Sequence, residues 1–75
     1  QMMKVFYMVC YDLDLFRRFI LETSFVEVYG VPEDTVEELK KNDLALLRFG
    51  FGWLLEEFTG GEGLKKAAKL LADFS

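Results

Sequence analysis

Two short apolar runs in the first half of the chain predict β-strands. Residues 4–11 (KVFYMVCY) combine β-branched and aromatic side chains with no polar alternation, as in a strand covered on both faces. Residues 24–31 (SFVEVYGV) are similar and are closed by Gly30 and Pro32. Between the two runs, apolar residues at helical spacing predict a short amphipathic helix from Asp12. The strand–helix–strand order favours a parallel pair of strands, and an antiparallel pair remains open.

The second half of the chain predicts three helices. The first follows Pro32, with Thr35 and Glu38 matching a capping box. The second covers residues 43–59, and the third covers residues 64–74 after the glycine-rich turn TGGEG. We therefore expect one small α/β domain over residues 2–75, with a strand–helix–strand unit, three helices and a two-stranded sheet per chain.

The predicted helix 43–59 has apolar residues on two sides. One side is a seam at spacings of three and four, with Leu55 beside it; the seam consists of Leu44, Leu47, Phe51, Leu54 and Phe58. The opposite side has Leu46, Phe49 and Trp53. Because a helix that is apolar on two sides is buried on two sides, we expect one side to contact a partner. The predicted interface is Leu46, Phe49, Gly50 and Trp53, most simply in a homodimer, although two copies could instead join their sheets.

Two glycines interrupt this helix between aromatic residues. Each costs about 1 kcal/mol of helix stability relative to alanine, so another contribution must offset the loss. Gly50 falls on the stripe of Leu46 and Trp53, which predicts close packing against another group. Gly52 falls on the polar strip, where it would relieve crowding or mark a bend. The alternative is a helix that breaks at this point.

Composition supports a partner and excludes several kinds of chemistry. Hydrophobic residues make up 52% of only 75 positions, which predicts apolar surface beyond one small core. The net charge of -4 disfavours nucleic-acid binding. Histidine is absent, so a Ser-His or Cys-His dyad is not available, and we nominate no catalytic residue and no cofactor. An enzyme is accordingly the less favoured class.

The single cysteine, Cys10, allows no disulfide within the chain and fits a reducing, cytoplasmic location. Its apolar surroundings predict a small buried side chain. Charged residues break the N-terminal apolar run, so we expect neither a signal peptide nor a membrane span. Abundant Glu and Lys with few side-chain amides hint at a thermophilic source.

Two acids after the first predicted strand, Asp12 and Asp14, are the candidate metal ligands, with Mg²⁺ or Ca²⁺ favoured. A structural interpretation competes, in which Asp12 caps the following helix and Asp14 pairs with Arg18. The leading hypothesis for function is a homo-oligomeric module for protein–protein interaction. The alternative is a protein that binds a small molecule or a divalent metal, with Asp12, Asp14 and nearby tyrosines at the strand ends.

Overall fold

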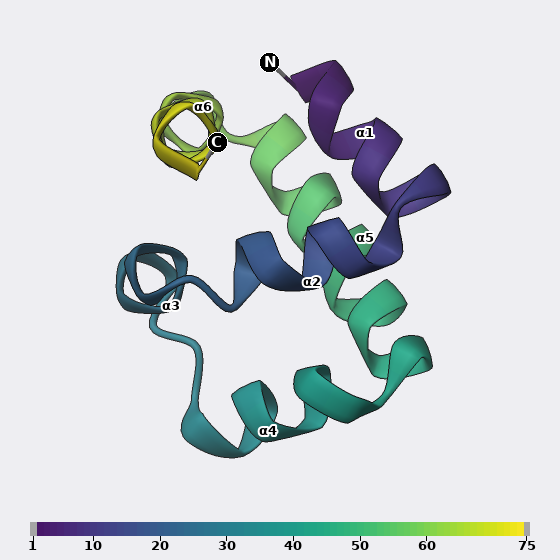
Figure 1. Cartoon of the computed structure of the whole chain (residues 1–75). Coiled ribbons are helices and arrows are strands. Elements are labelled where there is room, and N and C mark those ends of the chain that lie inside the picture. The colour runs from purple at the N-terminus through teal and green to yellow at the C-terminus, as the bar shows by residue number, and fades with distance from the viewer. Residues whose placement is uncertain (1, 75) are drawn as a thin grey trace.

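The chain is helical throughout the part that the structure describes. The computed structural model describes residues 2–74, apart from the side chains at positions 2, 3, 58, 61 and 64. This part forms six α-helices and no strand (Figure 1). The helices are α1 (Met2–Tyr11), α2 (Leu13–Ile20), α3 (Thr23–Tyr29), α4 (Glu33–Lys41), α5 (Asp43–Thr59) and α6 (Gly61–Phe74). The predicted α/β fold with a two-stranded sheet is therefore wrong, in the parallel and the antiparallel version alike.

The first predicted strand is helix α1, and its burial pattern explains the error. Val5, Met8 and Val9 are buried at positions i, i+3 and i+4, which is the period of a helix face. The opposite face also consists of apolar types, including Phe6 and Tyr7, and these side chains are exposed. Because both faces are apolar, the sequence shows no helical alternation although the helix has a distinct buried side.

The second predicted strand is helix α3, which ends at a glycine in the left-handed conformation. Phe25 and Tyr29, one turn apart, lie side by side with ring centroids 4.6 Å apart. Gly30 follows with φ +60° and ψ 43°, the left-handed conformation that glycine adopts without steric cost. Pro32 then precedes α4. Gly30 and Pro32 thus mark the end of one helix and the start of the next, and not the predicted end of a strand.

Helices α2, α4 and α5 lie where the sequence predicts helices, but α6 begins at Gly61 and not at residue 64, so most of the predicted glycine-rich turn is its first turn. Asp12 accepts a hydrogen bond from the Leu15 amide at 3.1 Å, as predicted for the cap of α2. Asn42 accepts one from the Ala45 amide at 3.1 Å, so it caps α5 and also ends α4. The predicted capping box is wrong, because α4 begins at Glu33 and Thr35 already lies inside it.

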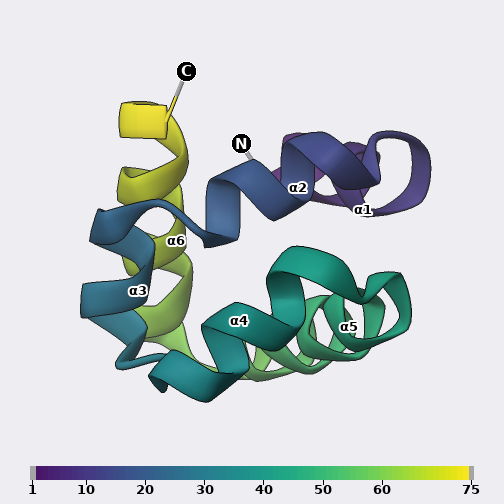
Figure 2. The ribbon, with the colours of Figure 1, turned by 60° about the horizontal axis from the view of Figure 1, so that its bottom comes forward.

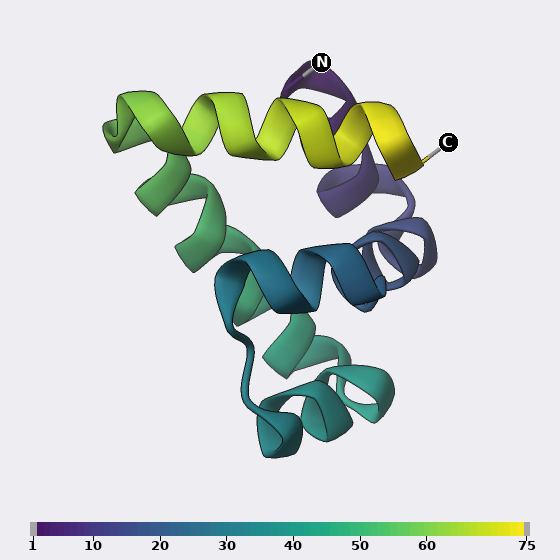
Figure 3. The same cartoon turned by 90° about the vertical axis from the view of Figure 1, so that its left-hand side faces the viewer.

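The six helices form a small bundle around α5. Helix α4 folds back beside the first half of α5, and α2 crosses α5 (Figure 1). Helices α3 and α6 lie side by side and run in opposite directions, as two turned views show (Figures 2 and 3). None of the described helices combines the length and the apolar character that crossing a bilayer requires.

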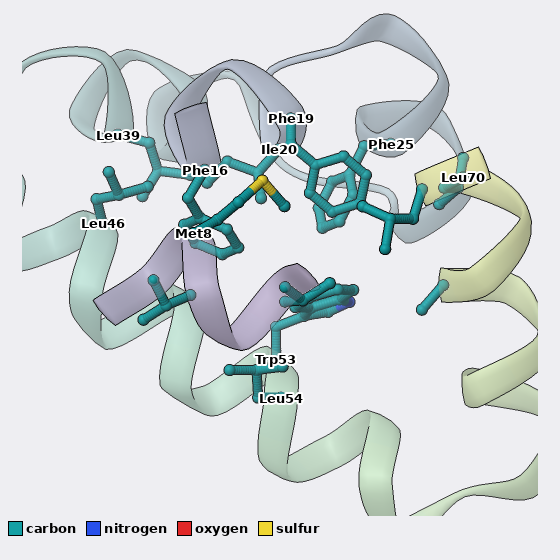
Figure 4. Close-up of a cluster of buried hydrophobic side chains, with 14 residues drawn as sticks. Met8, Phe16, Phe19, Ile20, Phe25, Leu39, Leu46, Trp53, Leu54 and Leu70 are labelled. Carbon is teal, nitrogen blue, oxygen red and sulfur yellow. The ribbon is translucent and has the colours of Figure 1, made fainter. Parts of the chain in front are cut away.

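An aromatic cluster fills the space between α2, α3 and α5. Trp53 of α5 is its central member, and it points from α5 toward the Phe19 and Phe25 side chains (Figure 4). Its ring centroid lies 6.3 Å from Phe16, 5.9 Å from Phe19, 5.3 Å from Phe25 and 6.0 Å from Tyr29. Edge-to-face and tilted contacts at these separations are favourable beyond the area that they bury.

The two glycines of α5 have different environments. Helix α5 continues through both, so the alternative of a broken helix is wrong. A Cβ atom at Gly50 would lie 2.7 Å from Cε2 of Phe16, which confirms the predicted close packing. A Cβ atom at Gly52 would meet nothing within 4 Å, so relief of crowding does not explain Gly52.

Candidate functional site

The four residues predicted as an interface contribute to the chain's own core. Leu46 is fully buried, Trp53 is only 6% exposed, and Gly50 lies beneath the Phe16 ring. Phe49 is half-buried and packs against the same core. These contacts explain why the stripe is apolar without any partner, and an additional contact of these residues with a second chain stays a prediction.

The opposite side of α5 is the exposed one. Leu44 is 60% exposed, Phe51 is 51% exposed and Leu55 is 71% exposed. We call these three residues the outer stripe. Leu47 and Leu54 of the predicted seam turn toward the rest of the fold, and the Phe58 side chain lies outside the described set. The sequence therefore correctly indicates two apolar sides, but the side predicted as the interface packs in the chain's own core, and the outer stripe is the exposed one.

A cleft of about 380 Å³ lies between α5 and the connection from α3 to α4. Gly52 lies on its α5 side, where the missing side chain leaves space. Aromatic and charged side chains line it together with the backbone of the connection; the lining residues are Tyr29, Gly30, Val31, Pro32, Arg48, Phe49, Gly52, Trp53, Glu56 and Glu57. Its volume lies within the usual range of sites for small molecules.

Three residues that line this cleft each have a buried polar atom without a close hydrogen bond among the described residues. These atoms are the Tyr29 hydroxyl, the Trp53 indole nitrogen and Oε2 of Glu57. Buried polar groups without partners are uncommon in folded proteins, because each loses its hydrogen bonds to water. The three atoms have almost no surface accessible to solvent, and Tyr29 interacts with both Trp53 and Glu57, so they form a buried polar cluster at the wall of the cleft. In the described part of the chain the cleft is the best candidate for a ligand site because of its volume and its aromatic and charged lining.

The electrostatic environment of Tyr29 reflects this burial. Burial raises the pKa of the Tyr29 hydroxyl above its usual value, and the Trp53 N–H partly opposes this effect. The nearby negative charges of Glu57 and Glu56 raise the pKa further. Above the Tyr29 ring, the Lys66 ammonium group lies 4.8 Å from the centroid, in cation–π geometry.

The exposed face of α1 is a second apolar surface. Tyr7 and Tyr11 stack with centroids 5.5 Å apart, and Tyr11 is 80% exposed. With Phe6 and Cys10 they line a shallow hollow of about 260 Å³. Cys10 is exposed, so the expectation of a buried cysteine is wrong. The reason is that helix α1 turns Cys10 away from the core, whereas a strand covered on both faces would have enclosed it.

The candidate metal ligands have structural partners. Asp12 caps α2, and Asp14 forms an ion pair with Arg17 at 2.9 Å, not with Arg18 as expected. Among the described residues no three acidic, cysteine or histidine side chains come close enough to share a metal ion. The tyrosines also separate, since Tyr29 lines the cleft whereas Tyr7 and Tyr11 lie on the exposed face of α1.

Comparison with family models, curated proteins and solved structures finds no match to this chain. Sequence reasoning did not single out Glu57 as a buried acid, although it follows Trp53 by four residues and so falls on the same buried side of α5. That spacing was the available signal.

Proposed function

We propose that this protein is a non-enzymatic interaction module that forms a homodimer through the outer stripe of α5. The observation that carries the proposal is the exposure of Leu44, Phe51 and Leu55 at one side of a helix whose other side is core. The spacing from Leu44 to Phe51 and Leu55 keeps all three on one face over three turns. Helix faces of this kind are stabilised by removal of their apolar area from water.

The outer stripe is complementary to itself when two copies of α5 run in opposite directions. If a two-fold axis passes midway along the stripe, Leu44 faces Leu55 of the second copy, and Leu55 faces Leu44. Arg48, one turn after Leu44, then faces Phe51 of the second copy, where a cation–π contact is favourable. The same surface patch thus serves both subunits, which is the requirement of a symmetric dimer.

The stripe of α5 is a better dimer surface than the exposed face of α1. Tyr7 and Tyr11 have hydroxyl groups that remain favourable in water, and their rings already contact each other. The three side chains of the outer stripe have no polar atom. We place the protein in the cytoplasm as part of this proposal, since an exposed single cysteine fits a reducing compartment.

Sedimentation equilibrium from about 5 to 200 μM tests the proposal. We expect a dimer for the unchanged chain and a monomer for Leu55→Glu, because antiparallel pairing would bury the new carboxylate against Leu44. Tyr11→Glu is the matched control, since it adds the same charge at an exposed position of α1 and should leave the dimer intact. A monomeric unchanged chain over this range, or a Leu55→Glu variant that still dimerises, would contradict the proposal.

A further inference from the structure

Helix α5 has one charge of each sign along one edge of the outer stripe. Arg48 comes four residues before Gly52, and Glu56 comes four residues after it. Residues at this spacing form one ridge on a helix, so the two charges lie on either side of the glycine, about 12 Å apart along the axis. All three positions are exposed. Phe51 and Leu55 lie three residues after Arg48 and Gly52 in turn, so the ridge borders the outer stripe.

The ridge is not explained by contacts within the chain. In the part of the chain that the structure describes, neither Arg48 nor Glu56 takes part in an ion pair. The position one turn from both of them, where either charge could have had a helical partner, is Gly52. A Cβ atom at Gly52 would meet nothing within 4 Å, so packing inside the chain does not offset the cost of this glycine in a helix.

Antiparallel pairing of two α5 helices brings opposite charges of this ridge together. In the dimer described above, Arg48 of one copy lies level with Phe51 of the other. Glu56 of that other copy is five residues beyond Phe51, about 7.5 Å along the axis, which two long side chains at the flank of a helix pair can span. The two-fold axis puts both ridges on the same side of the pair and repeats the contact with the copies exchanged. One ridge thus provides two ion pairs.

We infer that Arg48 and Glu56 select the partner of α5 and its direction, an inference that rests on the proposed dimer and names the charges that recognise the second copy. Gly52 between them lets the two helices approach closely at this edge. In a parallel pair each of the two charges would face its own like, which is repulsive. Arg48 keeps its contact with Phe51, because a guanidinium group can bind a carboxylate with its edge while its face lies on a ring.

Exchange of the two charges tests the pairing by sedimentation equilibrium at low salt. Arg48→Glu brings two acids together at both contacts, and Glu56→Arg brings two cations together. Each variant should therefore raise the dissociation constant of the dimer at least about tenfold. The two variants mixed in equal amounts should form a heterodimer, because every contact then joins opposite charges. The double variant should dimerise at least about fivefold more tightly than Arg48→Glu alone, since it restores both ion pairs with their signs exchanged.

The matched control is Lys69→Glu, which changes the net charge by the same amount as Arg48→Glu at an exposed position of α6. It should leave the dissociation constant within about twofold of the unchanged chain, because a remote exposed charge is screened. Circular dichroism verifies that each variant keeps its helices. If Leu55→Glu separates the dimer but the single exchanges do not weaken it, or their mixture stays monomeric, this inference is wrong and the dimer stands. A monomeric unchanged chain would overturn both.

Discussion

The Phe16 ring of α2 lies directly against Gly50 of α5, so that any side chain at Gly50 would collide with Cε2 at 2.7 Å. Gly52, half a turn further along the same helix, has open space in place of that ring. The two glycines have the same intrinsic cost in a helix, and their surroundings are opposite. They therefore form a natural pair for testing how the core is packed.

We predict opposite effects of alanine at the two positions. Gly50→Ala should lower the free energy of unfolding by about 1–3 kcal/mol, because the added methyl group overpacks a filled core. Gly52→Ala should raise it by about 0.5–1 kcal/mol, since the gain in helix propensity meets no steric cost. Urea unfolding followed by circular dichroism measures both values. A stabilising Gly50→Ala would show that Phe16 does not occupy this position.

Arg17 of α2 connects three helices, and we predict that this connection is worth more than an exposed ion pair. Its Nε donates to the carbonyl oxygen of Leu39 near the end of α4 at 3.0 Å, and it pairs with Asp14 and with Asp43 at the start of α5. The Leu39 carbonyl lies in the last turn of α4, where carbonyl groups lack helical partners. Arg17→Met should therefore reduce the free energy of unfolding by about 1.5–3 kcal/mol.

The control for Arg17 is Lys40→Met. Lys40 forms an ion pair with Glu37 at 2.9 Å, but both side chains are more than half exposed. Exposed pairs of this kind contribute about 0–1 kcal/mol. Chemical unfolding of both variants under the same conditions gives the comparison, and equal effects would mean that Arg17 does not hold α2, α4 and α5 together.

The sequence predicts the second half of this fold much better than the first half. Helix α5 has the predicted limits Asp43 and Thr59, since its apolar periodicity is long and Asn42 marks its start. Helix α1 was assigned to a strand because residues such as Tyr7 and Tyr11 are apolar or aromatic but exposed, which hides the helical period. The β-propensity of these residue types led to the strand prediction. In the folded chain, burial of Val5 and Met8 in the core favours a helix instead.

The candidate cleft was only partly predictable. Tyr29 is one of the tyrosines expected at the strand ends, and it does line the cleft, together with Trp53, which the sequence predicts in an interface instead. The burial of Glu57 was not predicted, because an acid on an apolar helix face gives no indication of what covers it. The contact of Glu57 with Gly63 depends on how α6 turns back against α5, and that angle cannot be derived from periodicity.

We predict that Gly63 is required by the Glu57 side chain. A Cβ atom at Gly63 would lie 2.0 Å from Oε2 and 2.8 Å from Cδ of Glu57. Gly63→Ala should therefore destabilise the chain by about 1–3 kcal/mol, although alanine is the better helix former. In a Glu57→Ala background most of this loss should disappear. A double-mutant cycle measures the coupling, and additive effects would contradict the contact.

We also predict a specific loss of stability at high pH from Tyr29. Its pKa is raised in the folded chain above the value of about 10 in the unfolded chain, so the folded state retains its proton to higher pH. The resulting stabilisation is complete below about pH 10 and is lost as pH rises through the folded pKa. Thermal unfolding between pH 8 and 11 should show this loss, and Tyr29→Phe should reduce it.

Absorbance titration of tyrosinate provides an independent check on Tyr29. The chain has three tyrosines, and the replacement of Tyr29 by phenylalanine should remove the component whose pKa burial raises. If the variant and the unchanged chain titrate identically apart from amplitude, the environment of Tyr29 does not disfavour its ionised form.

The connections between consecutive helices are only one to three residues long, from the single residue Asp12 to the three residues 30–32. Helices that are neighbours in the sequence therefore meet without closing a long loop, and little chain entropy is lost before their contacts form. Chains with such local contacts reach the native state in microseconds to milliseconds. This protein should accordingly fold rapidly, and no slow phase is expected from its topology.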